Sequence, residues 1–176
     1  SELDQIKAEN VDELELKWVL QNQVFGAWQS NPIVVDGIMY VTERPNSVMA
    51  LDAITGRVFW KYKHTPDERS RVCCGANNRG VAVLDDRVFM GTLDARLVAL
   101  DRISGEVLWE AEVGDVSRAY SVTMAPLVVK DKVIVGVGGG EYGIRGYVAA
   151  YDAATGEEVW KTYTIPGPGE SGHDSW

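Results

Sequence analysis

An eleven-residue pattern that occurs three times constrains the fold of this chain more than any other feature. The pattern is Ala-x-Asp-x-x-Thr/Ser-Gly-x-x-x-Trp, and its copies are Ala50–Trp60, Ala99–Trp109 and Ala150–Trp160. Their closing tryptophans are 49 and 51 residues apart. A period near 50 residues with one strand-turn-strand signal per unit is typical of the blades of a β-propeller, and less so of other repetitive β arrays.

Each copy predicts a tight turn between two strands, because aspartate can bond to the nearby backbone and glycine tolerates a positive φ. Hairpin signals supply the other strands of each unit. They are Asp36-Gly37 between 32–35 and 38–42, Asp85-Asp86 between 80–84 and 87–91, and Lys130-Asp131 between 126–129 and 132–136. With about four strands per unit, the sequence predicts an all-β fold, a partial propeller of about three four-stranded blades plus part of another.

The segment ahead of the first complete unit predicts the end of an incomplete blade. Asn10 and Glu13 have the spacing of a capping box, which predicts a short helical turn before a strand around residues 16–18. Blade repeats would then close near Trp18 and at the three repeat tryptophans. We expect these side chains to pack between neighbouring blades, each indole N–H donating to a backbone carbonyl, rather than to bind a cofactor.

Composition excludes several classes of function. The chain has 176 residues, 45% of them hydrophobic and 24% charged, which is ordinary for a globular domain with a core. A net charge of −9 without a basic stripe argues against binding to nucleic acid, and favours solubility or a basic protein partner. No apolar stretch approaches the roughly 20 residues of a membrane span. The N-terminus has no signal-peptide pattern, although a signal peptide already removed would leave no trace.

Cys73 and Cys74 are adjacent in sequence, so they cannot join distant parts of a fold. If oxidised, they would close an eight-membered ring and form a rigid, sulfur-faced platform suited to a planar ligand. The alternative is two small buried residues on a strand. Two cysteines are too few to indicate a redox compartment.

The two histidines are the remaining candidates for a base near neutral pH. His64 follows a predicted strand, and His173 lies in the polar segment near the C-terminus. Surface or loop positions are the expectation for both, so neither is assigned to a site.

The repeats, together with two further motifs, resemble the N-terminal part of the quinoprotein alcohol dehydrogenases that use pyrroloquinoline quinone (PQQ). The motifs are the Cys-Cys-x-x-x-Asn-Arg-Gly run at 73–80 and Gly-Gly-Glu-Tyr-Gly-Ile-Arg-Gly at 139–146. Non-catalytic propellers share the tryptophan repeat, so the two runs are the features that distinguish this family. The resemblance covers nearly all of residues 1–176. It implies eight blades around a central funnel, with the quinone lying flat between a vicinal disulfide and a tryptophan ring.

The resemblance also implies a set of site residues. The cofactor-binding positions would be Gln29, Cys73, Cys74, Arg79, Thr123, Gly138, Gly139 and Gly140. Cys73 and Cys74 would be joined as the disulfide, and Arg79 would lie at the polar edge of the quinone, where a guanidinium suits its carboxylates. Glu141 would bind calcium or a lanthanide, although by itself it fits an exposed acid in a glycine-rich loop. Gln29 replaces an acid found in many members, which implies a substrate different from that of the methanol-oxidising ones.

The resemblance implies that the complete enzyme is periplasmic and oxidises an alcohol to an aldehyde, passing electrons to a cytochrome c or a membrane quinone. The chain ends before the family's stacking tryptophan, second metal ligand and catalytic aspartate. It would therefore supply part of the cofactor and metal site, but no catalytic residue, and would need the missing C-terminal blades. Two alternatives remain: a non-catalytic scaffold that binds protein partners, and a remnant in which the site residues are present but unused.

Overall fold

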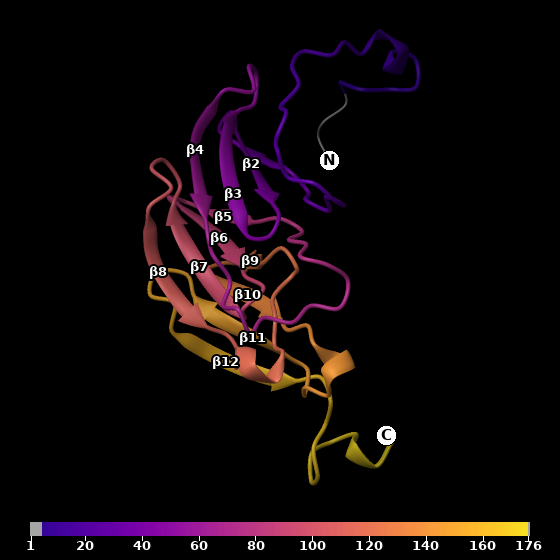
Figure 1. Ribbon diagram of the computed structural model, residues 1–176, viewed down its shortest axis with the longest axis vertical. Helices are drawn as coiled ribbons and strands as arrows, with labels where there is room; N and C mark the ends of the chain where they lie inside the picture. The colour runs from indigo at the N-terminus through magenta and orange to yellow at the C-terminus, as the bar shows by residue number, and fades with distance from the viewer. Residues whose placement is uncertain (1–4, 176) are drawn as a thin grey trace.

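The structure, a computed structural model, describes residues 5–175 and contains three four-stranded antiparallel sheets that follow one another along the chain (Figure 1). The first sheet consists of β1 (Ile33–Val35), β2 (Ile38–Glu43), β3 (Ser47–Asp52) and β4 (Val58–Lys63). The second consists of β5 (Ala82–Leu84), β6 (Arg87–Gly91), β7 (Arg96–Asp101) and β8 (Val107–Glu112). The third consists of β9 (Leu127–Val129), β10 (Lys132–Gly136), β11 (Tyr147–Asp152) and β12 (Glu158–Tyr163).

Within each sheet the strands pair in sequence order. The only helices of the described residues are four 3-10 turns: η1 (Val11–Glu13), η2 (Val116–Arg118), η3 (Gly140–Tyr142) and η4 (His173–Ser175). None of them is long and apolar enough to cross a membrane. The predicted all-β fold and its four-stranded units are thus confirmed.

The turn chemistry of the repeat explains why the strands end where they do. Asp52 Oδ1 accepts the backbone N–H groups of Ile54 and Thr55, both at 2.9 Å, and Asp101 and Asp152 make the equivalent bonds. These bonds replace the strand pairing that the backbone gives up as it turns. The β1–β2 hairpin turns through Asp36 and Gly37, both with positive φ, as an Asp-Gly pair favours.

Three tryptophans each dock onto the turn glycine of the unit that follows them in the chain. Trp60 donates its indole N–H to Arg102 O at 3.1 Å, and a Cβ built on Gly105 would lie 2.6 Å from its ring. Only a glycine allows so close an approach at a φ of +75°. The same arrangement joins Trp18 to Ala53 and Gly56, and Trp109 to Ala153 and Gly156. The predicted packing role is confirmed for these three tryptophans, whereas Trp160 is 41% exposed.

Neighbouring sheets pack face to face around two buried clusters. One cluster includes Tyr40 and Val48 of the first sheet with Val88 and Leu100 of the second. The other joins the second sheet to the third and includes Phe89, Leu97, Val133 and Tyr151. The second sheet therefore contributes to both clusters, whereas the first and third sheets each contribute to one. Outer strands such as β12 stay exposed.

The N-terminal segment differs from its prediction. The helical turn is present as η1, but Asn10 makes no side-chain cap, because its Oδ1 accepts the N–H of Lys7 at 2.7 Å instead. The strand predicted around residues 16–18 is wrong. No strand of the described residues runs beside this segment to supply ladder hydrogen bonds, and the chain there is extended but unpaired.

Candidate functional site

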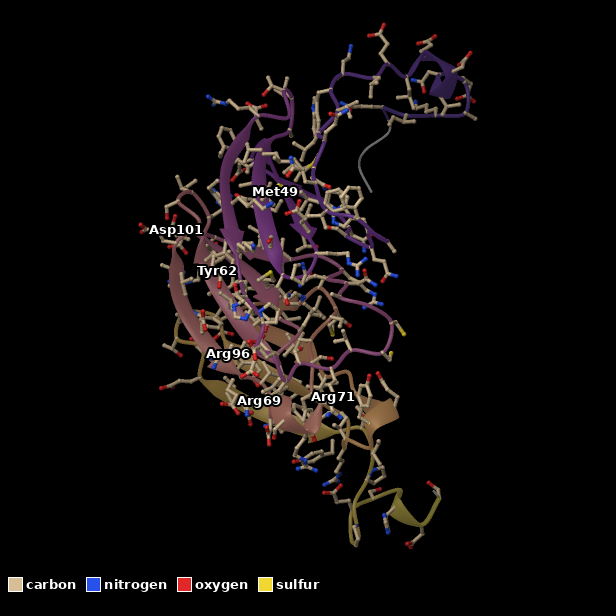
Figure 2. All side chains as sticks on the ribbon, viewed as in Figure 1. Met49, Tyr62, Arg69, Arg71, Arg96 and Asp101 are labelled. Carbon is tan, nitrogen blue, oxygen red and sulfur yellow. The ribbon has the colours of Figure 1, made fainter. Side chains whose placement is uncertain are left out.

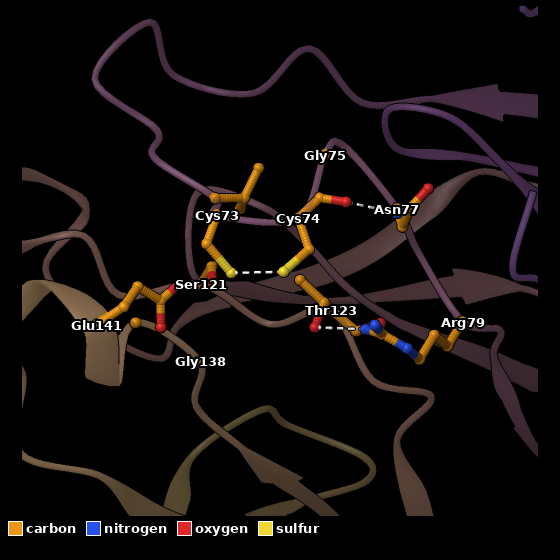
Figure 3. A pocket seen from close by; sticks show the side chains of 11 residues that line it. Cys73, Cys74, Gly75, Asn77, Arg79, Ser121, Thr123, Gly138 and Glu141 are labelled. Atoms are coloured by element: carbon orange, nitrogen blue, oxygen red, sulfur yellow. Dashed lines mark hydrogen bonds between the residues drawn. The ribbon is translucent and has the colours of Figure 1, made fainter. Parts of the chain in front are cut away.

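Three loops meet at one end of the sheets and enclose a cavity of about 150 Å³ (Figure 3). They are residues 64–81 between β4 and β5, 113–126 between β8 and β9, and 137–146 between β10 and β11. Backbone hydrogen bonds join them side by side: Arg79 N donates to Thr123 O at 3.0 Å, and Ser121 and Gly138 exchange two bonds at 3.1 and 2.8 Å. The lining residues are Val72, Cys73, Cys74, Gly75, Asn77, Arg79, Ser121, Thr123, Gly138, Gly139 and Glu141.

Cys73 and Cys74 form an exposed turn at the wall of this cavity. Both are free thiols with the sulfur atoms 2.8 Å apart, and Figure 3 shows the two sulfurs turned to the same side. Cys74 O accepts the Asn77 side-chain amide at 3.0 Å, which holds the turn in shape. The alternative of two buried residues on a strand is therefore wrong, and the disulfide stays a prediction.

Arg79 is held against the cavity by the neighbouring loop. Its Nη1 donates to Thr123 Oγ1 at 2.8 Å, and its backbone carbonyl accepts the N–H of Asn31 at 3.1 Å. Nε and Nη2 have no acceptor among the residues that the structure describes. The guanidinium is thus fixed in position while donors remain for an anionic ligand.

The glycines of 138–140 allow the third loop to pass close to the second. Gly139 has a φ of +122°, and a Cβ there would lie 2.3 Å from Ala119 O. A Cβ on Gly138 would lie 3.1 Å from Ser121 Oγ. A Cβ on Gly140 would meet no atom within 4 Å, and this glycine does not line the cavity, although it begins η3, which carries Glu141.

Glu141 and the two thiols influence one another. The pKa of Cys73 is raised to about 12, mainly by the Cys74 thiol and secondly by the Glu141 carboxylate. Ionising Cys73 would lose a hydrogen bond and place a second negative charge beside Glu141. The bond from the Cys73 thiol correspondingly lowers the pKa of Glu141. Within residues 5–175, no group of three or more His, Cys, Asp and Glu side chains is arranged to hold a metal ion. A cation in this cavity would find one carboxylate.

The structure brings together most of the predicted site residues and adds others. Gln29 is exposed and, like Gly140, does not line the cavity. Asn77 and Ser121 are lining residues that the sequence analysis missed. Ser121 stands two residues before Thr123, and alternate residues of an extended segment share a side. Asn77 lies inside the cysteine run, and its buried Oδ1 has no hydrogen-bond partner within residues 5–175.

His64 lies in a loop, one of the two positions expected for it, but little of its side chain is exposed. Its side chain is 11% exposed, and its Nε2 lies 3.0 Å from each carboxylate oxygen of Asp94. The histidine does follow β4 directly, in a loop as predicted, but that loop folds onto the second sheet and buries the ring. His173 is half-buried in η4 with Nδ1 3.1 Å from Pro166 O. Neither ring lines the cavity.

Comparison with known proteins matches the whole chain to one family. The model for the PQQ family described as glucose/ethanol/alcohol dehydrogenase, beta-propeller domain, matches residues 1–176. The chain is 46% identical over 170 residues to quinohemoprotein alcohol dehydrogenase ADH-IIG of Pseudomonas putida, covering 95% of this chain and 24% of that protein. It is 43% identical over 175 residues to the lanthanide-dependent methanol dehydrogenase of Methylacidiphilum fumariolicum, covering 97% of this chain and 28% of that protein.

Solved structures agree with this match. The structure of ADHIIG from Pseudomonas putida HK5 superposes with a TM-score of 0.91 at 44% identity, over 98% of this chain and 26% of that one. The chain thus spans about a quarter of the length of these relatives. The three sheets with their docked tryptophans match a propeller in fold as well as in sequence. The chain belongs to the β-propeller domain of the PQQ-dependent glucose, ethanol and alcohol dehydrogenase family.

Proposed function

We propose that this chain forms part of the cofactor and metal site of a periplasmic dehydrogenase that oxidises an alcohol to an aldehyde with PQQ. Electrons would pass on to a cytochrome c or a membrane quinone. The observation that carries the proposal is the convergence of Cys73, Cys74, Arg79 and Glu141 on one cavity, although 68 residues separate Cys73 from Glu141. Relatives named as quinohemoprotein alcohol dehydrogenase and methanol dehydrogenase support the substrate class.

The cavity fits one side of a flat, anionic cofactor. The two sulfurs offer a small surface against which a planar ring can lie, and the Arg79 guanidinium has free donors for a carboxylate. Gly138, where a Cβ would lie 3.1 Å from Ser121 Oγ, allows two of the loops that form the cavity wall to lie close together. A volume of about 150 Å³ is below the roughly 300–1,000 Å³ of enclosed ligand sites. The opposite wall would therefore come from parts of the protein outside these residues.

The fit to a metal ion is partial. Calcium takes about 6–8 oxygen ligands and a lanthanide is a similarly hard cation, yet among the residues that the structure describes Glu141 is the one carboxylate that lines the cavity. A glutamate carboxylate is ionised at neutral pH, as a ligand to a hard cation must be. Glu141 would supply one ligand, and the remaining ligands would come from the cofactor and from residues elsewhere in the full-length protein.

The roles of the chain's own residues follow from these contacts. PQQ, when bound, accepts two electrons from the substrate. Thr123 holds Arg79, whose guanidinium would bind and orient the cofactor's carboxylates. Cys73 and Cys74 would provide a surface for the ring and help to exclude water from it. Since Glu141 is assigned to a cation and no histidine lines the cavity, the group that removes the alcohol's proton is assigned to a part of the protein outside this chain.

A non-catalytic scaffold remains the second candidate. It would use the tryptophan repeat and the acidic surface, but it gives no reason for an exposed cysteine pair, a fixed guanidinium and a carboxylate on one cavity. Gln29 lies outside the cavity, so its position does not support the expectation that this residue changes the substrate.

The proposal is tested by titrating the full-length protein with PQQ in the presence of calcium or lanthanum, then assaying alcohol-dependent dye reduction. We expect saturable binding, which Arg79→Ala weakens at least about tenfold while Arg79→Lys retains part of it. The matched control is Arg102→Ala, which removes an ion pair with Asp36 far from the cavity. Absence of PQQ binding with either metal would reject the dehydrogenase and leave the scaffold.

A further inference from the structure

The loop that carries the two cysteines is anchored by one buried carboxylate outside the cavity. Asp94 lies in the turn between β6 and β7 and is 7% exposed. Each of its two carboxylate oxygens lies 3.0 Å from His64 Nε2. Asp94 also accepts the backbone N–H of Asp67 at 3.1 Å and the hydroxyl of Thr92. His64 and Asp67 belong to the loop of residues 64–81, whereas Asp94 and Thr92 belong to the second sheet.

The anchoring continues toward the cysteines. Ser70, three residues before Cys73, donates its hydroxyl to Leu93 O at 2.6 Å. Leu93 is the residue next to Asp94. At the start of the loop, His64 N donates to Asn46 O at 2.8 Å. Figure 2 labels Arg69, Arg71 and Arg96 at this end of the sheets, where the loop crosses from the first sheet toward the cavity.

Several contacts also hold the loop on the other side of the cysteines. Asn78 Nδ2 donates to Gly91 O at 2.7 Å, and Asn78 O accepts the Thr42 hydroxyl at 3.1 Å. Arg44 Nε donates to Ala76 O at 3.1 Å, and Asn77 bonds within the loop to Cys74 O. The cysteine turn itself is exposed. Its position over the cavity therefore depends on two attachments: residues 64–70 are tied to the second sheet on one side, and residues 76–80 are held on the other.

We propose that Asp94, through its bond to His64, is a positioning residue that fixes the N-terminal attachment of the Cys73-Cys74 turn and thereby helps to set the place of this turn over the cavity. Neither side chain lines the cavity, so both act through the loop. The buried carboxylate is well suited to this task, because bonds to a charged acceptor are stronger than neutral ones and leave it few other arrangements. The part of this proposal that concerns the cofactor rests on the proposed function, whereas the part that concerns the loop does not.

The test compares variants in the full-length protein without cofactor. His64→Ala removes the bond to Asp94, whereas His64→Gln places an amide donor near the position of Nε2 and serves as the conservative variant. Asp94→Ala removes every bond to the carboxylate. Val133→Ala, in β10 of the third sheet, is the control that destabilises the core without contacting the loop.

Amide hydrogen exchange in peptides that span residues 65–76 reports the freedom of the loop directly. We expect exchange at least about tenfold faster in His64→Ala and Asp94→Ala, a smaller change in His64→Gln, and none in Val133→Ala. Exchange unchanged in both Ala variants, or raised equally by Val133→Ala, would overturn the proposal, since the anchor would then have no local effect.

PQQ is the probe for the second half of the proposal. Its dissociation constant should rise about tenfold or more in His64→Ala and remain within about threefold of the original in His64→Gln and Val133→Ala. If the unchanged protein does not bind PQQ, the proposed function fails, and hydrogen exchange still decides whether Asp94 positions the loop. Binding that is unaffected in His64→Ala, despite a mobile loop, would refute the link between the anchor and the cofactor.

Discussion

The contact between Trp60 and Gly105 allows a prediction whose size follows from the structure. In Gly105→Ala, the new Cβ would lie 2.6 Å from two ring atoms of Trp60, at a residue whose φ is +75°. A non-glycine residue in the left-handed region costs about 1–2 kcal/mol. Forcing the ring aside adds about 1–3 kcal/mol for overpacking. The 3.1 Å bond from the indole to Arg102 O would also lengthen. We expect a total loss of about 2–5 kcal/mol.

Gly37→Ala is the matched control for this experiment. Gly37 has nearly the same φ, +76°, but a Cβ there meets no atom within 4 Å. Only the backbone cost of about 1–2 kcal/mol should remain. The two variants therefore separate conformational strain from the clash with the tryptophan.

The free energy of unfolding would be measured by urea titration of the full-length protein, with tryptophan fluorescence as the signal. A double-mutant cycle with Trp60→Ala tests the cause, because the clash disappears with the ring and Gly105→Ala should then cost no more than Gly37→Ala. Equal destabilisation by Gly105→Ala and Gly37→Ala in the unchanged background would refute the argument that this glycine is needed for docking.

Four further outcomes are expected. Cys73 and Cys74 should be joined as a disulfide in the native protein, so mass spectrometry after alkylation without reduction should find neither thiol labelled; two labelled thiols would contradict this. Glu141→Gln in the full-length protein should lower metal content and abolish alcohol oxidation with an unchanged circular dichroism spectrum, whereas normal turnover at full metal occupancy would remove Glu141 from the site. The isolated 176-residue chain should neither bind PQQ tightly nor oxidise an alcohol, and submicromolar binding with alcohol-dependent dye reduction would refute this. Burial opposes ionisation of Asp94, but the bonds from His64, from Thr92 and from the backbone outweigh it and lower its pKa from 3.8 to about 2. Asp94 should therefore contribute about 2 kcal/mol of stability above pH ~4 that is lost as the pH falls through about 2, so the difference in unfolding free energy from Asp94→Asn should shrink in acid; a pH-independent difference would contradict this.

Local patterns predicted the strands and turns well, because their causes lie within a few residues. The Asp36-Gly37 pair forms its hairpin, and Asp52 bonds to the backbone immediately after it, whatever lies elsewhere in the chain. Strand prediction failed near Trp18, because a strand needs a paired neighbour and the local sequence does not say whether one is present. The prediction that Asn10 caps η1 failed, because its side chain bonds to the backbone of the earlier residue Lys7 and not to the helical turn that follows.

In the candidate site, too, local sequence predicted the residue types, whereas long-range packing decided which of them meet. Sequence motifs pointed to Arg79, Thr123 and Glu141, but only the alignment of three loops from successive sheets shows that they share a cavity and that Gln29 does not. The environment of His64 depends on Asp94, 30 residues away, so nothing beside the histidine predicts its burial. Sequence by itself determined the repeat, its turns and the residue types of the site. The tertiary structure alone decided which of those side chains meet, because long-range contacts depend on how whole sheets pack.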